Sequence, residues 1–325
     1  MLLGKLYLDH TDSSAAVASA RSLLTDLRHS LARRLTSTRW MSPASVKVAQ
    51  TKLSGMRMEI AGPQRWRQKR WSAQGWFGYS VAMAHDMIQR QLRRLGHVER
   101  RDDWFDTVGP TAVNAFYNVH SNALFVPAAI LAPPFLVRNV ARLYGGLGGI
   151  LGHEMTHGFD DTGRLFSPQL TIQNWWDKHT IVEFKRRAQC IASAYSRHMA
   201  PGGSHVDGNR TLGEDIADVG GVRLALLALR QRFRRERKPL AKSIRREFFI
   251  AWAQNWFIAA CLYLTRNRCQ IATPATAKLR AATDSHAPPE TRVNAALAQL
   301  PDFAHAFHCP LGSPLHPPTP PCDLW

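Results

Sequence analysis

The sequence predicts a mainly α-helical fold with a small β component, which is an α+β architecture. Most apolar residues recur at helical spacing, and few segments have the length and boundaries of a strand. An apolar content of 45% in 325 residues is enough to bury a large core. We therefore expect one large domain, or one large domain with a smaller appendage.

The N-terminal region predicts helices followed by a connector. Residues 12–60 carry apolar side chains at helical spacing, interrupted near Pro43, and we expect two helices there. Between Gly62 and about Gly109 the composition shifts to Trp, Arg and Gln, and the periodicity becomes weak. This segment is predicted to be a connector or a poorly packed insertion.

The rest of the chain predicts one strand, several helices and an irregular tail. Residues 122–130 are apolar and short enough for a strand, and Pro127 favours an edge position because proline cannot donate a ladder hydrogen bond. Helices are expected at residues 139–159, 175–198, 212–237, 244–265 and, briefly, 289–300. The proline-rich tail ends in CDLW and is predicted to be a tied-down, strand-like terminus.

The charge of the chain is strongly positive, at +18 with a pI of about 10.5. Basic residues gather in two runs, at 65–101 and 230–246. Such runs would suit nucleic acid or an anionic surface, but no nucleic-acid motif accompanies them. Solvated helix faces are the simpler interpretation, and no nucleic-acid partner is expected. Binding to an anionic surface remains an alternative.

One segment has nearly the composition of a membrane span. Residues 248–265 carry no formal charge, but Gln254 and Asn255 lie at their middle. Unpaired amides are costly in lipid, so a buried helix of a soluble core is favoured. The N-terminal MLLGKLYLDHTDSS has no apolar core of signal-peptide length, and neither a signal nor an anchor is expected in this chain.

A metal-binding motif stands at residues 153–157, which read HEMTH. Four residues make about one helical turn, so both imidazoles project from one face and can share a tetrahedral zinc ion. Glu154 lies beside the coordination position left open for water. Two buried histidines and a glutamate without a metal would be three desolvated polar groups, and a zinc ion satisfies them together.

A catalytic zinc needs a third protein ligand. Downstream, Glu214 and Asp218 lie four residues apart on one helical face. One carboxylate can therefore bind the metal while the other accepts a hydrogen bond from the distal N–H of a histidine ligand. The pair alone would more simply be a solvated face, and the HEMTH motif is what favours a metal site.

Together these motifs resemble the neprilysin and endothelin-converting enzyme family of zinc metallopeptidases. The matching segments, in chain order, are VNAFYN (113–118), FVPAAILAPPF (125–135), GHEMTHGFDDTGR (152–164), NWWD (174–177), TLGEDIADVGG (211–221), DSHAPPETRV (284–293) and the terminal CDLW. The resemblance implies a thermolysin-like zincin catalytic lobe at 102–325. Residues 1–61 would be the partial, helical end of the family's N-terminal domain, and residues 62–101 a divergent connector.

The resemblance also implies roles for individual residues. His153, His157 and Glu214 would bind one zinc ion, with Glu154 as general base and Asp218 orienting a zinc-bound histidine. Further implied residues are His286 for the oxyanion, Asn114, Ala115 and Arg292 for the substrate backbone, and Ile130, Phe135, Ile150 and Trp256 for a hydrophobic pocket. The implied activity is hydrolysis of oligopeptides on the amino side of hydrophobic residues.

Cysteines and localisation follow from the same resemblance. Cys190 and Cys322 match a pair that the family joins, whereas Cys269 and Cys309 match cysteines whose partners lie in the family's other half. Cys261 falls in an insertion without a counterpart. An extracellular or plasma-membrane setting is implied, since family members are usually membrane-anchored. The alternative function is a truncated, inactive relative that binds only zinc or peptides.

Overall fold

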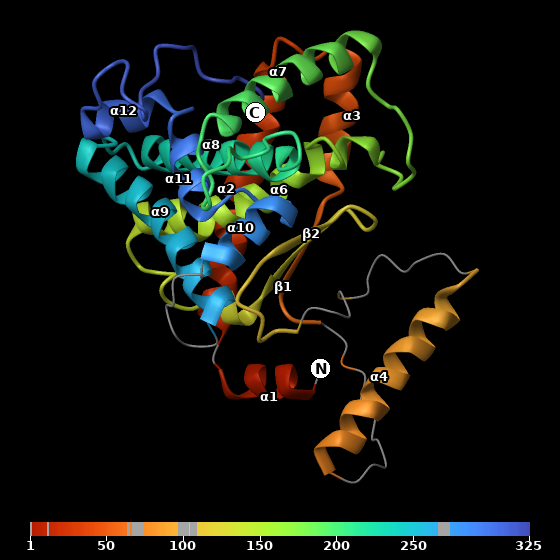
Figure 1. The fold of residues 1–325 in the computed structure, drawn as a ribbon. Coiled ribbons are helices and arrows are strands. Elements are labelled where there is room, and N and C mark those ends of the chain that lie inside the picture. The colour runs from red at the N-terminus through yellow and green to blue at the C-terminus, as the bar shows by residue number, and fades with distance from the viewer. Residues whose placement is uncertain are drawn as a thin grey trace.

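The computed structural model describes residues 2–11, 13–63, 66, 75–96, 104, 109–265 and 274–325, and it has the expected mainly helical fold (Figure 1). The helices are α1 (Leu2–His10), α2 (Ser14–Ser37), α3 (Pro43–Ser54), α4 (Gly75–Arg94), α5 (Val140–Leu143), α6 (Gly149–Thr156), α7 (Lys178–Ser196), α8 (Leu212–Arg235), α9 (Lys242–Thr265), α10 (Pro274–Thr283), α11 (Pro289–Leu297) and α12 (Pro301–Phe307). The strands are β1 (Arg57–Ala61), β2 (Phe116–Asn118) and β3 (Ala123–Pro127).

The two N-terminal helices that the periodicity predicts are α2 and α3. Ser42 caps α3, because its hydroxyl accepts a hydrogen bond from the backbone N–H of Ser45, and Pro43 suits the first helical turn. Apolar residues of both helices belong to the main hydrophobic core. The expectation that residues 12–60 hold helices alone is wrong at its end, because residues 57–61 form strand β1.

The sheet has the strand order β1-β3-β2, with β1 parallel and β2 antiparallel to β3. The predicted strand therefore exists, but its predicted edge position is wrong, since β3 lies in the centre. Pro127 fits there because the ladder between β2 and β3 reaches only as far as Phe125 of β3. Pro127 is the last residue of β3 and pairs with Ala61 of β1 alone. After Phe125, β3 is therefore paired with β1 only.

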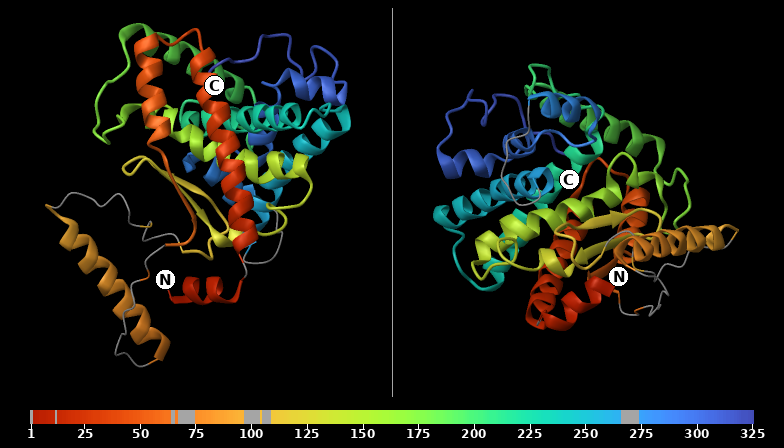
Figure 2. Two further views of the ribbon diagram at one scale, coloured as in Figure 1. Left: turned by 180° about the vertical axis from the view of Figure 1, so that it is seen from behind. Right: turned by 60° about the horizontal axis from the view of Figure 1, so that its bottom comes forward.

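The predicted helix at 139–159 is present as one helical run with an irregular middle. Helix α5 continues through a π-helical turn (Tyr144–Gly148) into α6, and a short 3-10 turn (His157–Phe159) follows. Its glycines allow close packing: a Cβ on Gly145 would lie 1.9 Å from the carbonyl oxygen of Phe248, and one on Gly152 would lie 2.7 Å from that of Gly221. Helix α8 thus packs directly against α6, the helix of the HEMTH motif, while α9 packs against α5 and the π-helical turn (Figure 2).

Helices α7, α8, α9 and α11 agree with the predicted segments, whereas α10 and α12 were not predicted. In α9, Phe248, Phe249 and Trp252 are buried in the protein core, as expected for a helix of a soluble domain. The amide of Asn255 donates a hydrogen bond to the carbonyl of Gly146 (2.9 Å), so it is paired as predicted for a protein interior. Among the described residues, no helix has the length and apolar character that crossing a bilayer requires.

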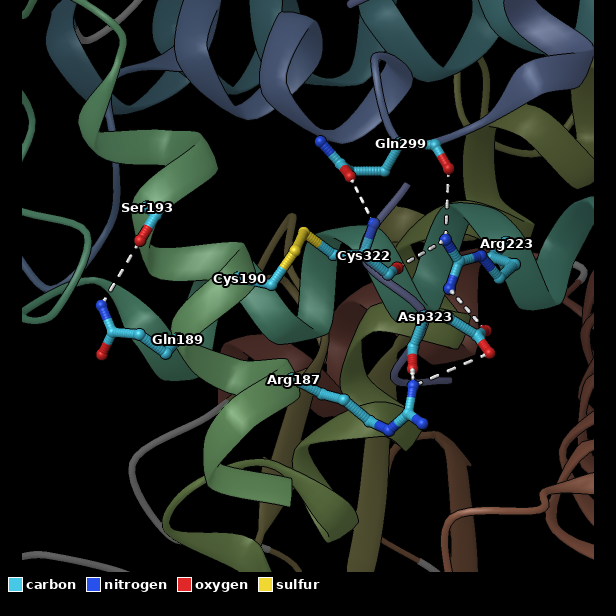
Figure 3. The surroundings of a disulfide bond; sticks show 8 residues. All are labelled: Arg187, Gln189, Cys190, Ser193, Arg223, Gln299, Cys322 and Asp323. Atoms are coloured by element: carbon cyan, nitrogen blue, oxygen red, sulfur yellow. Dashed lines mark hydrogen bonds and ion pairs between the residues drawn. A yellow bond between two sulfur atoms is a disulfide. The ribbon is translucent and has the colours of Figure 1, made fainter. Parts of the chain in front are cut away.

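The C-terminal tail is tied down, although residues 321–325 join no strand of the described sheet. A disulfide joins Cys190 of α7 to Cys322, and the Arg223 side chain donates a hydrogen bond to the carbonyl of Cys322 (Figure 3). Arg223 donates another to the backbone oxygen of Trp325. Trp325 is buried in the main core. The disulfide is the pair that the family resemblance implied.

The predicted connector contains more structure than its weak periodicity indicates. Residues 75–94 form α4, which stands apart from the helical body in Figure 1. Trp76 and Phe77 are 85% and 81% exposed, and neither hydrophobic cluster includes a described residue of α4. The proposed boundaries at residues 61 and 101 stay predictions.

Candidate metal centre

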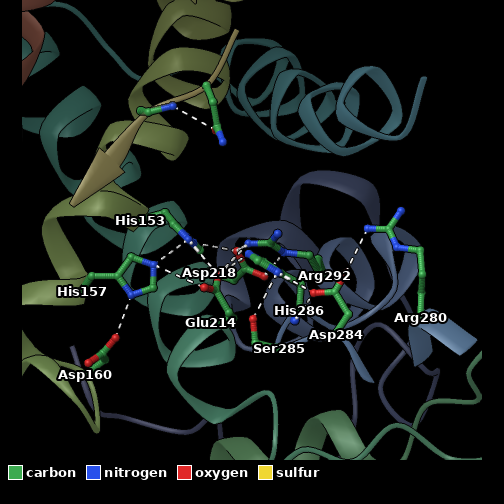
Figure 4. A network of polar contacts seen from close by, with 12 residues as sticks. His153, His157, Asp160, Glu214, Asp218, Arg280, Asp284, Ser285, His286 and Arg292 are labelled. Atoms are coloured by element: carbon green, nitrogen blue, oxygen red, sulfur yellow. Dashed lines mark hydrogen bonds and ion pairs between the residues drawn. The ribbon is translucent and has the colours of Figure 1, made fainter. Parts of the chain in front are cut away.

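The two histidines of the HEMTH motif face each other across one helical turn (Figure 4). Their Nε2 atoms are 3.0 Å apart, and Oε2 of Glu214 lies 3.1 Å from Nε2 of His153. The second oxygen of Glu214 is 3.7 Å from Nε2 of His157. His153, Glu154 and His157 place one ligand atom each within 4.8 Å of one another. The structure therefore brings the three predicted metal ligands together around one point.

The outer nitrogen of each imidazole meets a carboxylate. Nδ1 of His153 is 2.9 Å from Oδ1 of Asp218, and Nδ1 of His157 is 2.7 Å from Oδ2 of Asp160. Sequence reasoning placed Asp218 here but missed Asp160. The contact of Asp160 with His157 could have been predicted, because the two residues are three apart in the sequence, within one helical turn.

This donor set fits a zinc ion. A proton on each Nδ1, held by its carboxylate, leaves the Nε2 lone pairs of both histidines and the carboxylate of Glu214 directed at one another. Three acceptors in a buried place are unfavourable without a cation between them. Two ligand nitrogens at about 2.05 Å from a tetrahedral ion lie roughly 3.3 Å apart, close to the observed separation.

The charges around the site shift several pKa values. Burial acts to lower the pKa of His153, but hydrogen bonds and charge from Asp218 and Glu214 outweigh it and raise the pKa to about 10. Burial acts in the opposite sense on Glu214, yet the hydrogen bond from His153 and the nearby positive charges hold its pKa below the usual range.

Glu154 lies on the pocket side of α6 and is only 9% exposed. Burial raises the pKa of its carboxyl, while His153 and His157 partly offset that effect. A backbone hydrogen bond from Tyr117 of β2 also favours its charged form. A carboxylate whose pKa is raised by burial is suited to accepting and returning a proton near neutral pH.

Arg292 is held behind the metal ligands by a two-point ion pair. Its Nε and Nη2 atoms each lie 2.8 Å from an oxygen of Asp218, and Nη2 is 3.4 Å from Glu214. The guanidinium lies 3.6 Å from the ring centroid of Trp256, and the residue is 7% exposed. Arg292 therefore stabilises the carboxylate that orients His153, a contact that sequence reasoning did not foresee.

His286 reaches the site from the loop between α10 and α11. Its Nε2 is 3.2 Å from Oε2 of Glu214, and its Nδ1 is 2.8 Å from Oδ1 of Asp284. Arg280 bonds the other oxygen of Asp284 at 3.0 Å. Asp284 thus fixes the ring of His286, which is exposed enough to meet a bound molecule.

A pocket of about 850 Å³ opens onto this centre. Its lining includes every predicted substrate-binding residue, namely Asn114, Ala115, Ile130, Phe135, Ile150, Trp256 and Arg292. Ile130 and Phe135 are buried and contribute an apolar wall. Fold and site thus combine a mainly helical lobe, an HExxH helix, a glutamate from a second helix beside both histidines and an adjoining apolar pocket.

The sequence and fold of this chain are similar to those of known peptidases. A family model described as peptidase family M13 matches residues 114–324. The chain belongs to peptidase family M13. It is 32% identical to mouse membrane metallo-endopeptidase-like 1 and 31% identical to Caenorhabditis elegans neprilysin-1. Each alignment covers 99% of this chain, but only 43% and 44% of the respective relative.

Solved structures show the same relationship. The zinc metalloprotease ZMP1 of Mycobacterium tuberculosis, solved with an inhibitor, superposes with a TM-score of 0.84 at 30% identity. The superposition covers 99% of this chain and 49% of that one. This chain therefore spans about half the length of the M13 proteins it matches, or less. The predicted membership of the neprilysin and endothelin-converting enzyme family is confirmed.

The cysteines are only partly accounted for. The predicted disulfide between Cys190 and Cys322 is present, and Cys309 is a half-buried free cysteine. The side chain of Cys261 and the whole of Cys269 lie outside the described residues. That Cys269 matches a cysteine whose partner lies in the family's other half therefore stays a prediction.

Proposed function

We propose that this M13 chain is a zinc-dependent metallopeptidase that hydrolyses peptide bonds of oligopeptides. The observation that carries the proposal is the convergence of His153, His157 and Glu214 on one point, with Glu154 beside it at the floor of the pocket. Zinc at this point would polarise the scissile carbonyl and lower the pKa of a water molecule toward about 7.

Glu154 would transfer the protons of the reaction. Its carboxylate is buried beside the two histidines, and it would take a proton from the attacking water. It would then return that proton to the amine that leaves when the peptide C–N bond breaks. Asp160 and Asp218 would keep both imidazoles in the orientation that binds the metal.

His286 and Arg292 would stabilise charge on the substrate. His286 stands at the exposed side of Glu214, where its Nε2 can donate to the oxygen that becomes negative in the tetrahedral intermediate. Within the described part of the chain, Nη1 of Arg292 makes no hydrogen bond, and it would donate to a substrate carbonyl.

The shape of the pocket supports the proposed specificity. Ile130, Phe135, Ile150 and Trp256 would bind a large apolar side chain on the carboxyl side of the cleaved bond. Asn114 and Ala115 line the same pocket next to strand β2, where an extended peptide backbone would align. Cleavage on the amino side of hydrophobic residues would follow.

The disulfide supports an oxidising setting for the protein. Disulfides persist mainly in extracellular and other oxidising compartments, and here one joins the exposed Cys190 to the buried Cys322. We propose an extracellular or cell-surface location, with peptides as partners.

The test is hydrolysis of a quenched fluorescent peptide, measured together with the zinc content of the purified chain. Activity should disappear with a chelator and return when zinc is added. A Glu154→Gln variant should keep about one zinc per chain yet lose turnover by roughly 10²- to 10⁴-fold, the usual contribution of a general acid–base group. Bound zinc without cleavage by the unmodified chain would instead identify a zinc-binding relative that lacks activity.

A further inference from the structure

Lys52 is a buried lysine that faces the backbone next to the metal centre. It belongs to α3, its side chain is fully buried, and its ammonium lies 5.7 Å from the ring centroid of Phe159. Nζ donates hydrogen bonds to the carbonyls of Gly163 (2.6 Å) and Phe166 (2.8 Å). Burying an amine is costly unless it is paired. The two hydrogen bonds therefore fix the Lys52 side chain to the segment from Gly163 to Phe166.

The segment that Lys52 holds also shapes the surroundings of His157. The backbone N–H of Gly163 donates to Oδ1 of Asp160 at 2.6 Å, while the other oxygen of Asp160 meets Nδ1 of His157. Gly163 packs so tightly that a Cβ there would lie 1.8 Å from the carbonyl oxygen of His157. A short path of hydrogen bonds therefore leads from Nζ of Lys52, through Gly163 and Asp160, to the ring of His157.

The backbone of Lys52 supports the opposite wall of the site. Its carbonyl accepts a hydrogen bond from the Asn122 amide (2.8 Å), and the amide oxygen of Asn122 accepts one from the Tyr117 hydroxyl (2.8 Å). Tyr117 lines the pocket. The same residue of α3 thus contacts the loop after the histidines and the turn between β2 and β3.

We propose that Lys52 is a positioning residue that fixes Asp160, and through it the zinc-binding orientation of His157. The inference rests on the proposed zinc site, but it concerns how the fold holds that site. Replacing Lys52 by methionine would remove one of the two hydrogen bonds that each carbonyl accepts, since Gly163 also accepts from the N–H of Phe166 and Phe166 from the indole of Trp175. The segment that carries Asp160 would then be held less firmly to α3. The His157 ring would then adopt its ligand orientation less often, and zinc would bind more weakly.

The experiment measures the zinc dissociation constant by competition with a chromogenic chelator. Lys52→Met should weaken zinc binding about tenfold, at the low end of what outer partners of metal ligands contribute. Lys47→Met, on the exposed side of the same helix, is the matched control and should bind zinc like the unmodified chain. An unchanged dissociation constant in Lys52→Met would overturn the proposal.

Two further variants separate positioning from general loss of stability. Leu35→Ala removes a buried core contact of α2, and it should lower the melting temperature without weakening zinc binding at temperatures where it stays folded. If Leu35→Ala weakens zinc binding as much as Lys52→Met, the effect is global and the proposal fails. Should Lys52→Met not fold, Lys52→Gln replaces it, since its amide can donate to one of the two carbonyls.

A double-mutant cycle with Asp160→Asn tests the path itself. If Lys52 acts through Asp160, the two substitutions together should weaken zinc binding by clearly less than the product of their separate effects. Independent, multiplicative effects would show that Lys52 does not act through Asp160. A chain that binds no zinc before any substitution would refute the proposed function instead, so the two failures are distinguishable.

Discussion

Replacing Arg292 should damage the metal centre before it affects substrate binding. The guanidinium makes two parallel 2.8 Å contacts with Asp218, which has no exposed surface, and Asp218 in turn holds His153. Removing one partner of a buried ion pair costs about 3–5 kcal/mol, because the other charge is left uncompensated. Arg292→Met should lower the free energy of unfolding by about that amount. Arg292→Lys keeps a charge but loses the paired geometry, and we expect a smaller loss.

The assay is urea unfolding of the metal-free and zinc-loaded proteins, with zinc affinity measured in parallel. Arg280→Met is the matched control: Arg280 also pairs with an aspartate and lines the pocket, but its side chain is 49% exposed, so its loss should cost less than about 1 kcal/mol. The reasoning would be refuted if Arg292→Met kept the stability and zinc affinity of the unmodified chain and raised only KM. Arg292 would then serve the substrate alone.

His286→Gln should lower kcat by about 10²- to 10³-fold with zinc content unchanged, as measured with the quenched peptide; a change in KM alone would contradict the oxyanion role. The double substitution Cys190→Ala with Cys322→Ala opens a loop with a sequence separation of 132 residues and should destabilise the chain by about 2–5 kcal/mol in urea unfolding. The pKa of His153 is raised to about 10 from an unfolded value near 6.5, so its stabilising charge is fully present below about pH 6.5 and is lost as the pH rises toward 10. The metal-free chain should therefore lose stability across that window while zinc binding strengthens and releases a proton, which calorimetry in two buffers can detect.

The parts of the site that sequence predicted are those set by local spacing. His153 and His157 lie one turn apart on a helix, and Glu214 and Asp218 lie one turn apart on another, so each pair could be identified from its own segment. The same rule could have found Asp160. That these pairs belong to one site was inferred from the third ligand that a catalytic zinc needs and from the family resemblance, since no local rule brings α6 and α8 together.

The fold was predicted well where periodicity is long and poorly where context decides. Helices α2 and α7 each bury a mainly apolar stripe, and the sequence shows its helical spacing directly. Strand β1 has only five residues, four of them half-buried, so it gives little alternating signal. The central position of β3 was not predicted, because Pro127 lies past the ladder with β2. A proline in a strand does not show how far the neighbouring ladder extends.

The least predictable contacts are those that join distant segments, and they are also the ones that orient the site. The Arg292 side chain reaches Asp218 across 74 residues, and the Lys52 side chain reaches Gly163 across 111. Each bonds to a group that leads to a histidine of the proposed metal site: Arg292 to His153 through Asp218, and Lys52 to His157 through Gly163 and Asp160. If Nη1 of Arg292 also binds a substrate carbonyl, peptide binding and the orientation of His153 share one side chain. Substrate and zinc should then bind cooperatively, and Arg292→Lys should weaken that coupling more than it weakens the binding of either one alone.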